Sequence, residues 1–224
     1  KTIFAQQCMR RAMAKLSTYP PTIGRHLAGL FLDVAGIFLP RRCAGCDGML
    51  MRHEEAICGD CVEDLPRLRA HNDPGNRVEQ VFKGRIRLHA ASAFLLFTKD
   101  GMVQHMLHRL KYHGDQGVGL ELGRLMALDA MASPRFADVQ AVLPVPLHRS
   151  RMRQRGYNQA QVLVDGMRQA WPLEPCEADL LRVVHTSTQT RRGRMERWSN
   201  VKAAFQLADD AGLRGKHVLL VDDG

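Results

Sequence analysis

The chain has 224 residues, of which 45% are hydrophobic and 25% charged, and its formal net charge is +9. This length allows one α/β domain with a small appendage, and the apolar run at 27–39 is too short to cross a bilayer, so we expect no membrane span. The positive charge favours polyanions or phosphorylated ligands as partners, while the scarcity of Trp and Tyr argues against a long base-stacking platform.

The first third of the chain predicts helices, a cysteine-rich segment and a linker. Residues 3–16 favour a helix that stops at Pro20-Pro21, and a second helical run follows through residue 38. The cysteines occupy 41–64, and the stretch at 65–77, which contains Pro and Gly, is typical of a linker.

The rest of the chain alternates predicted strands with predicted helices. The apolar pattern predicts strands at 88–97, 139–145 and 217–221, and helices at 102–112, 120–131 and 158–170. This alternation indicates an α/β fold with a mostly parallel, doubly wound sheet.

Four cysteines form two closely spaced pairs, Cys43-x2-Cys46 and Cys58-x2-Cys61, with eleven residues between them. Four thiolates at this spacing favour one tetrahedral, structural Zn²⁺, and neighbouring glycines let amide groups turn toward the sulfurs. Those glycines are Gly45, Gly48 and Gly59, and the distant Cys8 and Cys176 are expected to be apolar fillers. Two disulfides or four reduced thiols are the alternatives. Disulfides would need an oxidising compartment, and nothing reads as a signal peptide, so we expect a cytoplasmic protein.

Two candidate binding features follow predicted strands, where ligands bind in open α/β sheets. After 139–145 comes an arginine-rich loop with Arg149, Arg151 and Arg153, and then the segment Arg155-Gly156-Tyr157-Asn158-Gln159. Guanidinium groups, a glycine and a helix N-terminus suit a phosphate or pyrophosphate, although solvated arginines are the alternative. The carboxylates Asp222 and Asp223 follow 217–221 and suit ribose hydroxyls or a phosphate-bridged Mg²⁺, or else an ordinary helix N-cap.

A third, strongly cationic segment spans 188–205 and predicts a mobile flap over an anionic ligand, or else a solvated basic loop. Its candidate binding residues are Gln189, Arg191, Arg192, Arg194, Arg197 and Asn200.

Taken together, these segments resemble the ComF family, whose members join a small zinc-binding module to a type I phosphoribosyltransferase domain. The resemblance begins near residue 36 and implies a zinc module at 39–66 and a phosphoribosyltransferase-like domain at 78–224, incomplete at its C-terminus; the predicted helical extension at 1–38 precedes them. The matching stretches are 40–46, 57–61, Leu110-Lys111-Tyr112, 143–147, 155–160, Gln189 with Arg197 and Asn200, and 218–223.

The resemblance also implies ligands and roles. Asp222 and Asp223 would be the catalytic pair that binds phosphoribosyl pyrophosphate with Mg²⁺, and Gln189, Arg197 and Asn200 would lie in a flexible loop. The pyrophosphate would lie near Lys111, Arg155, Gly156 and Asn158. Family members are linked to DNA uptake in natural transformation and some to gluconate utilisation, so a competence helicase or another DNA-processing protein is an expected partner.

Two departures from the family pattern bear on these expectations. The family's acidic pair continues into a Thr-Thr-Gly loop that cradles the 5′-phosphate, whereas this sequence stops at Gly224. We therefore expect Mg²⁺-dependent binding of phosphoribosyl pyrophosphate in the complete gene product and little in this chain. Some relatives also carry a further cysteine pair after the first four, and this chain has none.

Two functions are compatible with these features. The favoured one is DNA uptake through binding of single-stranded DNA and phosphoribosyl pyrophosphate, with phosphate contacts from Arg149, Arg151, Arg153, Arg191, Arg192 and Arg194. The alternative is an active phosphoribosyltransferase that acts on an unknown acceptor and has no role with DNA. Affinity for single strands that falls with salt would indicate the first function; saturable, Mg²⁺-dependent ligand binding would indicate the second.

Overall fold

The computed structural model describes residues 41–173, 180–183, 205–207 and 212–224. The chain divides into two compact units, Lys1–Arg41 and Arg42–Gly224, and the following description concerns the second. The predicted helices within 1–38 lie outside the described residues, as do Cys8, Cys176 and the six polar residues of 188–205 named above.

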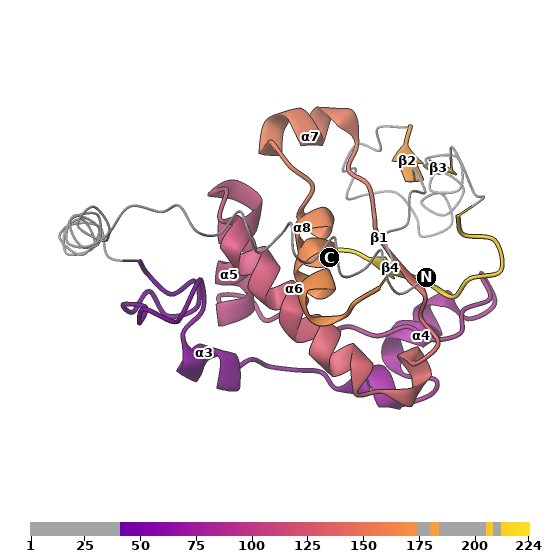
Figure 1. The fold of residues 1–224 in the computed structure, drawn as a ribbon, viewed down its shortest axis with the longest axis horizontal. Coiled ribbons are helices and arrows are strands. Elements are labelled where there is room, and N and C mark those ends of the chain that lie inside the picture. The colour runs from indigo at the N-terminus through magenta and orange to yellow at the C-terminus, as the bar shows by residue number, and fades with distance from the viewer. Residues whose placement is uncertain (1–40, 174–179, 184–204, 208–211) are drawn as a thin grey trace, which may run out of the picture. The chain divides into compact units, whose positions relative to one another are not determined.

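The second unit is a mixed α/β structure (Figure 1). Its helices are α3 (Gly59–Glu63), η1 (Ala70–Asn72), α4 (Arg77–Phe82), α5 (Met102–Tyr112), α6 (Gln116–Met131), η2 (Pro134–Phe136), α7 (Arg149–Arg155) and α8 (Gln159–Ala170). Its strands are β1 (Ala141–Pro144), β2 (Leu180–Arg182), β3 (Phe205–Leu207) and β4 (Val218–Val221). The predicted helix at 102–112 is confirmed, and α6 begins four residues before the predicted 120.

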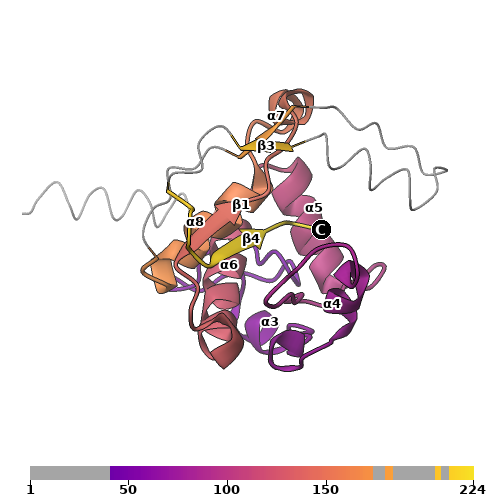
Figure 2. The same ribbon diagram turned by 90° about the vertical axis from the view of Figure 1, so that its right-hand side faces the viewer.

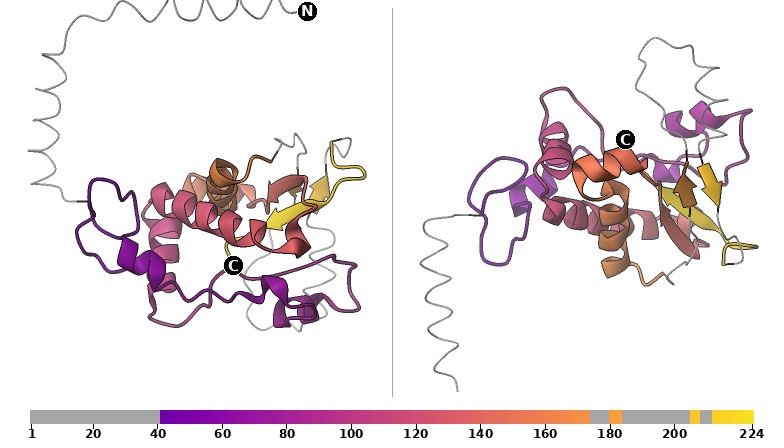
Figure 3. Two further views of the ribbon diagram at one scale, coloured as in Figure 1. Left: turned by 60° about the horizontal axis from the view of Figure 1, so that its bottom comes forward. Right: turned by 90° about the horizontal axis from the view of Figure 1, so that it is seen from above.

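Strands β1 and β4 form a small parallel sheet, with Ala141 opposite Val218 and Pro144 opposite Val221. Their apolar sequences suit strands that pack against helices, and Val142 and Val221 are buried in the same core. Figure 2 shows the two strands side by side with α6 and α8 behind them, and the views in Figure 3 agree. The parallel part of the predicted fold is therefore confirmed for this pair. Strands β2 and β3, which the sequence pattern did not predict, pair antiparallel.

Helices α6 and α8 pack unusually closely because glycines face each other at their crossing. A methyl group on Gly123 would overlap the carbonyl oxygen of Leu163, and one on Gly166 would overlap that of Leu120. The apolar face of α8, including Val162, completes this contact. The backbones can approach only because side chains are missing there, and the close contact fixes where α8 begins.

Three predicted elements are wrong. Residues 88–97 do not form a strand: their backbone pairs with 66–68 through one bridge, Arg67 to Leu95, and two hydrogen bonds. Pro66 has no amide hydrogen, so the ladder cannot extend there. Residues 65–77 are also more than a linker, because Leu65 is buried and the 3-10 helix η1 lies within this stretch.

The third correction concerns the arginine-rich stretch, which is the helix α7 rather than a loop. The helix begins after His148, whose ring nitrogen accepts the amide hydrogen of Ser150 at 3.2 Å. It ends at Gly156, whose φ of 79° is the left-handed conformation that glycine adopts at helix ends.

Candidate functional site

The four cysteines of the two pairs come together at one point. Their Sγ atoms all lie within 4.8 Å of one another, and those of Cys46 and Cys58 are 3.8 Å apart. A regular tetrahedron around Zn²⁺ with bonds of about 2.3 Å has sulfur-to-sulfur edges of about 3.8 Å. The donor set and its spacing therefore fit a metal ion such as zinc.

Backbone amides prepare one of these thiols for ionisation. The amide hydrogens of Gly45 and Cys58 point at Sγ of Cys43, with nitrogen-to-sulfur distances of 3.3 and 3.2 Å. Burial opposes ionisation, but the amides of Cys58, Cys46 and Gly45 outweigh it and lower the pKa of Cys43 to about 7. Burial and the neighbouring thiols raise the pKa of Cys61. Full ionisation of all four thiols therefore needs a cation at their centre.

The cysteine cluster packs into the main hydrophobic core and does not stand apart from it. A methyl group on Gly45 would lie 2.8 Å from both Sγ of Cys61 and Cε of Met106 on α5, so this glycine allows the close approach. Arg109 of α5 donates hydrogen bonds to the carbonyl oxygens of Arg42 and Cys43, both at 3.2 Å. The division into a zinc module at 39–66 and a domain at 78–224 stays a prediction.

A second group of polar side chains lies at the carboxyl ends of β1 and β4. Because the two strands are parallel, the residues after Pro144 and after Val221 emerge at the same edge of the sheet. The amide of Asn158 donates to the carbonyl oxygen of Val145 at 3.0 Å, so the start of α8 lies at this edge. Asp222 and Asp223 directly follow β4, as the sequence predicts.

Lys111 reaches the second carboxylate of the acidic pair from α5. Its Nζ lies 3.1 Å from Oδ2 of Asp223, and the two side chains are only 18% and 10% exposed. Lys111 also donates to the carbonyl oxygens of Asp223 and Gly224, at 3.4 and 3.1 Å. The structure thus brings together a lysine and a carboxylate 112 positions apart in the sequence.

The first carboxylate, Asp222, has a different environment. Desolvation of its carboxyl group, and then the neighbouring charge of Asp223, raise the pKa of Asp222, although the residue as a whole is exposed. An added cation would relieve this repulsion, since carboxylates that share a site resist ionising together. The pair is thus able to accept a cation, with Lys111 already balancing one carboxylate.

The segment after α7 is fixed between α5 and α8. The hydroxyl of Tyr157 donates to the carbonyl oxygen of Leu110, and burial raises the pKa of Tyr157, which keeps it a donor. Arg155 donates to Oε1 of Gln159 at 2.8 Å, and its guanidinium lies 5.7 Å from the ring centroid of Tyr112. Lys111, Arg155 and Asn158 therefore lie near the carboxyl ends of β1 and β4. With Asp223 we call this group the crevice edge, after the place where ligands bind in open α/β sheets, while its members' roles with a ligand stay predictions.

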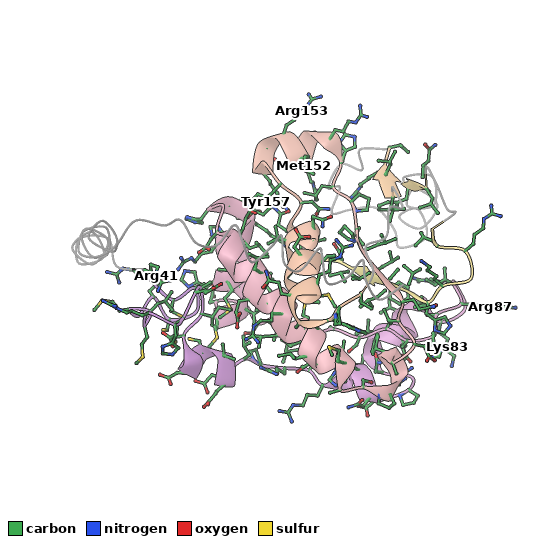
Figure 4. All side chains as sticks on the ribbon, viewed as in Figure 1. Arg41, Lys83, Arg87, Met152, Arg153 and Tyr157 are labelled. Carbon is green, nitrogen blue, oxygen red and sulfur yellow. The ribbon has the colours of Figure 1, made fainter. Side chains whose placement is uncertain are left out.

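Helix α7 carries four arginines and no acidic residue. Arg149 and Arg153 are exposed, whereas Arg151 and Arg155 are half-buried. Residues four apart share a helix face, so Arg149 and Arg153 form one outward stripe. Among the residues that the structure describes, none forms an ion pair with Arg149, Arg151 or Arg153. Figure 4 shows Arg153 extending from α7 away from the other elements.

Sequence reasoning missed the residues that hold these features in place. Arg109 makes its shortest contact with Asp115, at 2.7 Å, besides its bonds to the cysteine segment. Its position on the helix at 102–112 did not indicate these contacts, because an arginine on a predicted helix is normally solvated. Tyr112 belongs to the stretch that resembles the family, but its place beside Arg155 became visible only in three dimensions.

Known proteins similar to this chain share most of its length. Competence protein F of Haemophilus influenzae is 26% identical over 199 residues, which are 83% of this chain and 85% of that protein. Competence protein ComFC of Bacillus subtilis is 24% identical over 191 residues, 78% of this chain and 74% of that protein. These similarities support the resemblance of the chain to the ComF family.

A further similar protein is DNA utilization protein YhgH of Escherichia coli O157:H7, 27% identical over 184 residues, or 81% of this chain and 70% of that protein. No family model and no solved structure matches the chain. The type I phosphoribosyltransferase fold therefore stays a prediction. Within the described part of the chain, no helix is long and apolar enough to cross a membrane.

Proposed function

We propose that this chain takes part in DNA uptake by binding single-stranded DNA along α7. The names of its relatives, two competence proteins and a DNA utilization protein, support a role with DNA. The observation that carries the DNA contact is α7 itself, a short helix with four arginines, two of them exposed, and no acidic residue. Such a helix attracts a phosphate backbone without reading its sequence.

The contact would run along the stripe of Arg149 and Arg153, with Arg151 behind it. The chain has no acidic residue from Val139 to Val164, so no local carboxylate within that segment repels a phosphate. Arg191, Arg192 and Arg194, outside the described residues, would extend this basic surface. A competence helicase or another DNA-processing protein would receive or deliver the strand.

The cysteine cluster would support this function structurally. We assign Zn²⁺ to it, held by Cys43, Cys46, Cys58 and Cys61, because four thiolates in tetrahedral spacing suit zinc. All four positions would be filled by protein, so the ion would stabilise the fold and take no part in a reaction.

A second candidate function is binding of phosphoribosyl pyrophosphate with Mg²⁺ at the edge of the sheet, with phosphoribosyl transfer to an unknown acceptor. The acidic pair beside Lys111 favours it, because carboxylates suit Mg²⁺ and ribose hydroxyls. Arg155, Gly156 and Asn158 would lie near the pyrophosphate, and Gln189, Arg197 and Asn200 would belong to a covering loop. Asp222 and Asp223 would hold the ribose and metal.

The DNA-binding proposal is tested by the salt dependence of binding to labelled oligo(dT), measured by fluorescence anisotropy. Arg153→Ala should weaken binding and reduce the slope of log K against log salt by about 0.7, the value for one phosphate contact on a single strand. Arg87→Ala is the matched control, because Arg87 is also exposed and lies far from α7 in Figure 4. Equal effects of the two substitutions, or binding that does not change with salt, would contradict the proposal.

The second candidate is tested by calorimetry of the complete gene product with phosphoribosyl pyrophosphate. Asp223→Asn should abolish the Mg²⁺-dependent heat of binding. Asp138→Asn should leave it unchanged, because Asp138 is an exposed carboxylate that precedes β1, at the opposite end of that strand. Binding that is unchanged in Asp223→Asn would remove this candidate while leaving the DNA-binding proposal intact.

A further inference from the structure

The ring of Tyr112 is exposed beside the basic helix α7. Tyr112 is the last residue of α5, directly after Lys111, and 65% of it is accessible to solvent. An aromatic ring contributes to stability mainly through burial, so a ring this exposed contributes little to the fold. The turn of α5 that carries it is nevertheless held in place, because Tyr157 binds the carbonyl oxygen of Leu110, two residues earlier.

The ring of Tyr112 has planar groups beside it, and one of them is the cationic guanidinium of Arg155. The guanidinium of Arg155 lies 5.7 Å from its ring centroid, within the range of cation–π attraction. The ring of His108 lies 4.7 Å away by centroid, and that of His113 lies 5.2 Å from His108. Arg155 belongs to α7, so the exposed ring adjoins the helix whose outward stripe carries Arg149 and Arg153.

This arrangement combines the two features by which proteins hold single strands without sequence preference: cations that follow the phosphates and an aromatic face on which a base can stack. Two acidic groups, one in the turn after α5 and one that reaches the end of α5 from the end of β4, are already paired with basic side chains of α5. Asp115 lies 2.7 Å from Arg109, and Asp223 lies 3.1 Å from Lys111. Little uncompensated negative charge from these groups therefore opposes an approaching nucleotide.

We propose that Tyr112 is a stacking platform for a nucleobase, with Arg155 beside it and the phosphates of the same strand on Arg149 and Arg153. The proposal rests on the proposed binding of single-stranded DNA and adds the residue that contacts the base. It assigns one stacked base, not a row of them, in agreement with the scarcity of Tyr and Trp in the sequence. The ligand chemistry is a nucleobase ring, which a DNA strand or a free nucleotide could supply, and we assign it to the strand.

The test measures the affinity of the full chain and of its Tyr112 variants for two different strands by fluorescence anisotropy. The ligands are oligo(dT) and a strand of equal length whose sugars carry no bases, so that only phosphates remain. Tyr112→Ala should weaken binding to oligo(dT) by about 5- to 100-fold, as loss of one stacked base predicts, and should leave affinity for the abasic strand unchanged. Tyr112→Phe should bind both strands as the unsubstituted protein does, because it keeps the ring.

A matched control is Phe97→Ala, since Phe97 is 59% exposed and precedes the opposite end of α5. It should change neither affinity. Equal losses on both strands in Tyr112→Ala, or no loss on oligo(dT), would overturn the stacking assignment while leaving DNA binding itself intact. If the unsubstituted protein binds neither strand, both proposals fail together.

A further titration with dTMP separates the two sources of the base. The strand assignment predicts weak dTMP binding that does not account for the affinity of oligo(dT). Strong dTMP binding that is lost in Tyr112→Ala, with oligo(dT) and abasic strands bound equally, would assign the ring to a free nucleotide and overturn its role on the strand.

Discussion

The cysteine cluster and the crevice edge differ in how far apart in the sequence their members lie. The four thiols come from a stretch of 19 residues, 43–61, and are chemically identical. The crevice edge gathers Lys111 from α5, Arg155 from α7, Asn158 before α8 and Asp223 after β4. The first site is local in sequence and needs a cation to balance its four thiolates, whereas the second is assembled by the fold and already contains one ion pair, Lys111 with Asp223.

This difference predicts that the structure of the cysteine cluster depends on a bound ligand, whereas the structure of the crevice edge does not. Without a metal, the cysteine segment loses the cation that stabilises its thiolates together. Without a ligand, the crevice edge keeps its geometry, since Tyr157 and Asn158 bind backbone oxygens of Leu110 and Val145. Substitutions that affect one region should therefore leave the other nearly intact.

The largest expected effect is in the cysteine cluster. Cys58→Ser should reduce bound zinc from about one ion per chain and lower the free energy of unfolding by on the order of 5 kcal/mol, part of the roughly 10–16 kcal/mol that structural zinc contributes in small domains. Metal analysis and chemical unfolding measure the two effects. Cys8→Ser is the matched control, a thiol outside the two pairs, and should change neither value.

The same variant tests the independence of the two regions. Cys58→Ser should still bind oligo(dT) at low temperature, because α7 and the crevice edge have no hydrogen bond or ion pair with Cys58 among the described residues. A zinc-free protein of unchanged stability would remove the metal assignment. Loss of DNA binding in a folded Cys58→Ser variant would show that the two regions act as one.

The next largest effect on stability is expected at the contact between α6 and α8. Gly123→Ala should destabilise the protein by about 3 kcal/mol, because the new methyl group would overlap a backbone carbonyl that cannot rotate away. The zinc content should not change. Thermal unfolding with metal analysis measures both.

Gly117→Ala on the same helix is the control for this substitution. Its methyl group would meet Cβ of Ala56 at 3.4 Å, an ordinary contact, so the gain in helix propensity of up to about 1 kcal/mol should dominate. Equal stability of Gly123→Ala and Gly117→Ala would contradict the close helix contact.

The two regions also differ in how well the sequence predicted them. The cysteine pairs indicated a metal site because ligand spacing is a local property, and the four thiols do lie together. The apolar pattern likewise predicted α5 and the parallel strands β1 and β4, because burial imposes a period on the residues. Local pattern is thus sufficient where the structure depends on neighbours in sequence.

The sequence pattern failed to predict the structure where tertiary contacts determine it. The run at 88–97 is apolar enough for a strand, but its partner contains Pro66, and no sequence window of either segment reveals that pairing. The stretch 149–155 looks like a loop because it has no apolar face, yet a helix forms between the cap at His148 and the turn at Gly156. The contact of Tyr112 with Arg155 spans 43 positions and depends on how α5 and α7 are placed.

The smallest expected effect concerns Glu79, which lies in neither region and supplies a reference for acid sensitivity. Its carboxylate lies 2.7 Å from Arg135 and accepts the amide hydrogens of Gly75 and Ala91, at 2.7 and 3.1 Å. Burial alone would raise the pKa of Glu79, but the two amides and the guanidinium outweigh it and hold the pKa below its usual value of 4.5.

Because this pKa is lowered by folding, the stabilisation is complete above the unfolded pKa and is lost as the pH falls through the folded one. Glu79→Gln should therefore lower the free energy of unfolding at pH 7 by about 1–2 kcal/mol, the low part of the range for hydrogen bonds to charged groups. The difference from the unsubstituted protein should shrink and vanish at acid pH. Urea unfolding across pH measures it, with the exposed Glu63→Gln as control. A difference that stays constant with pH would mean that Glu79 acts through packing and not through its charge, and acid sensitivity would then be left to the cysteine cluster.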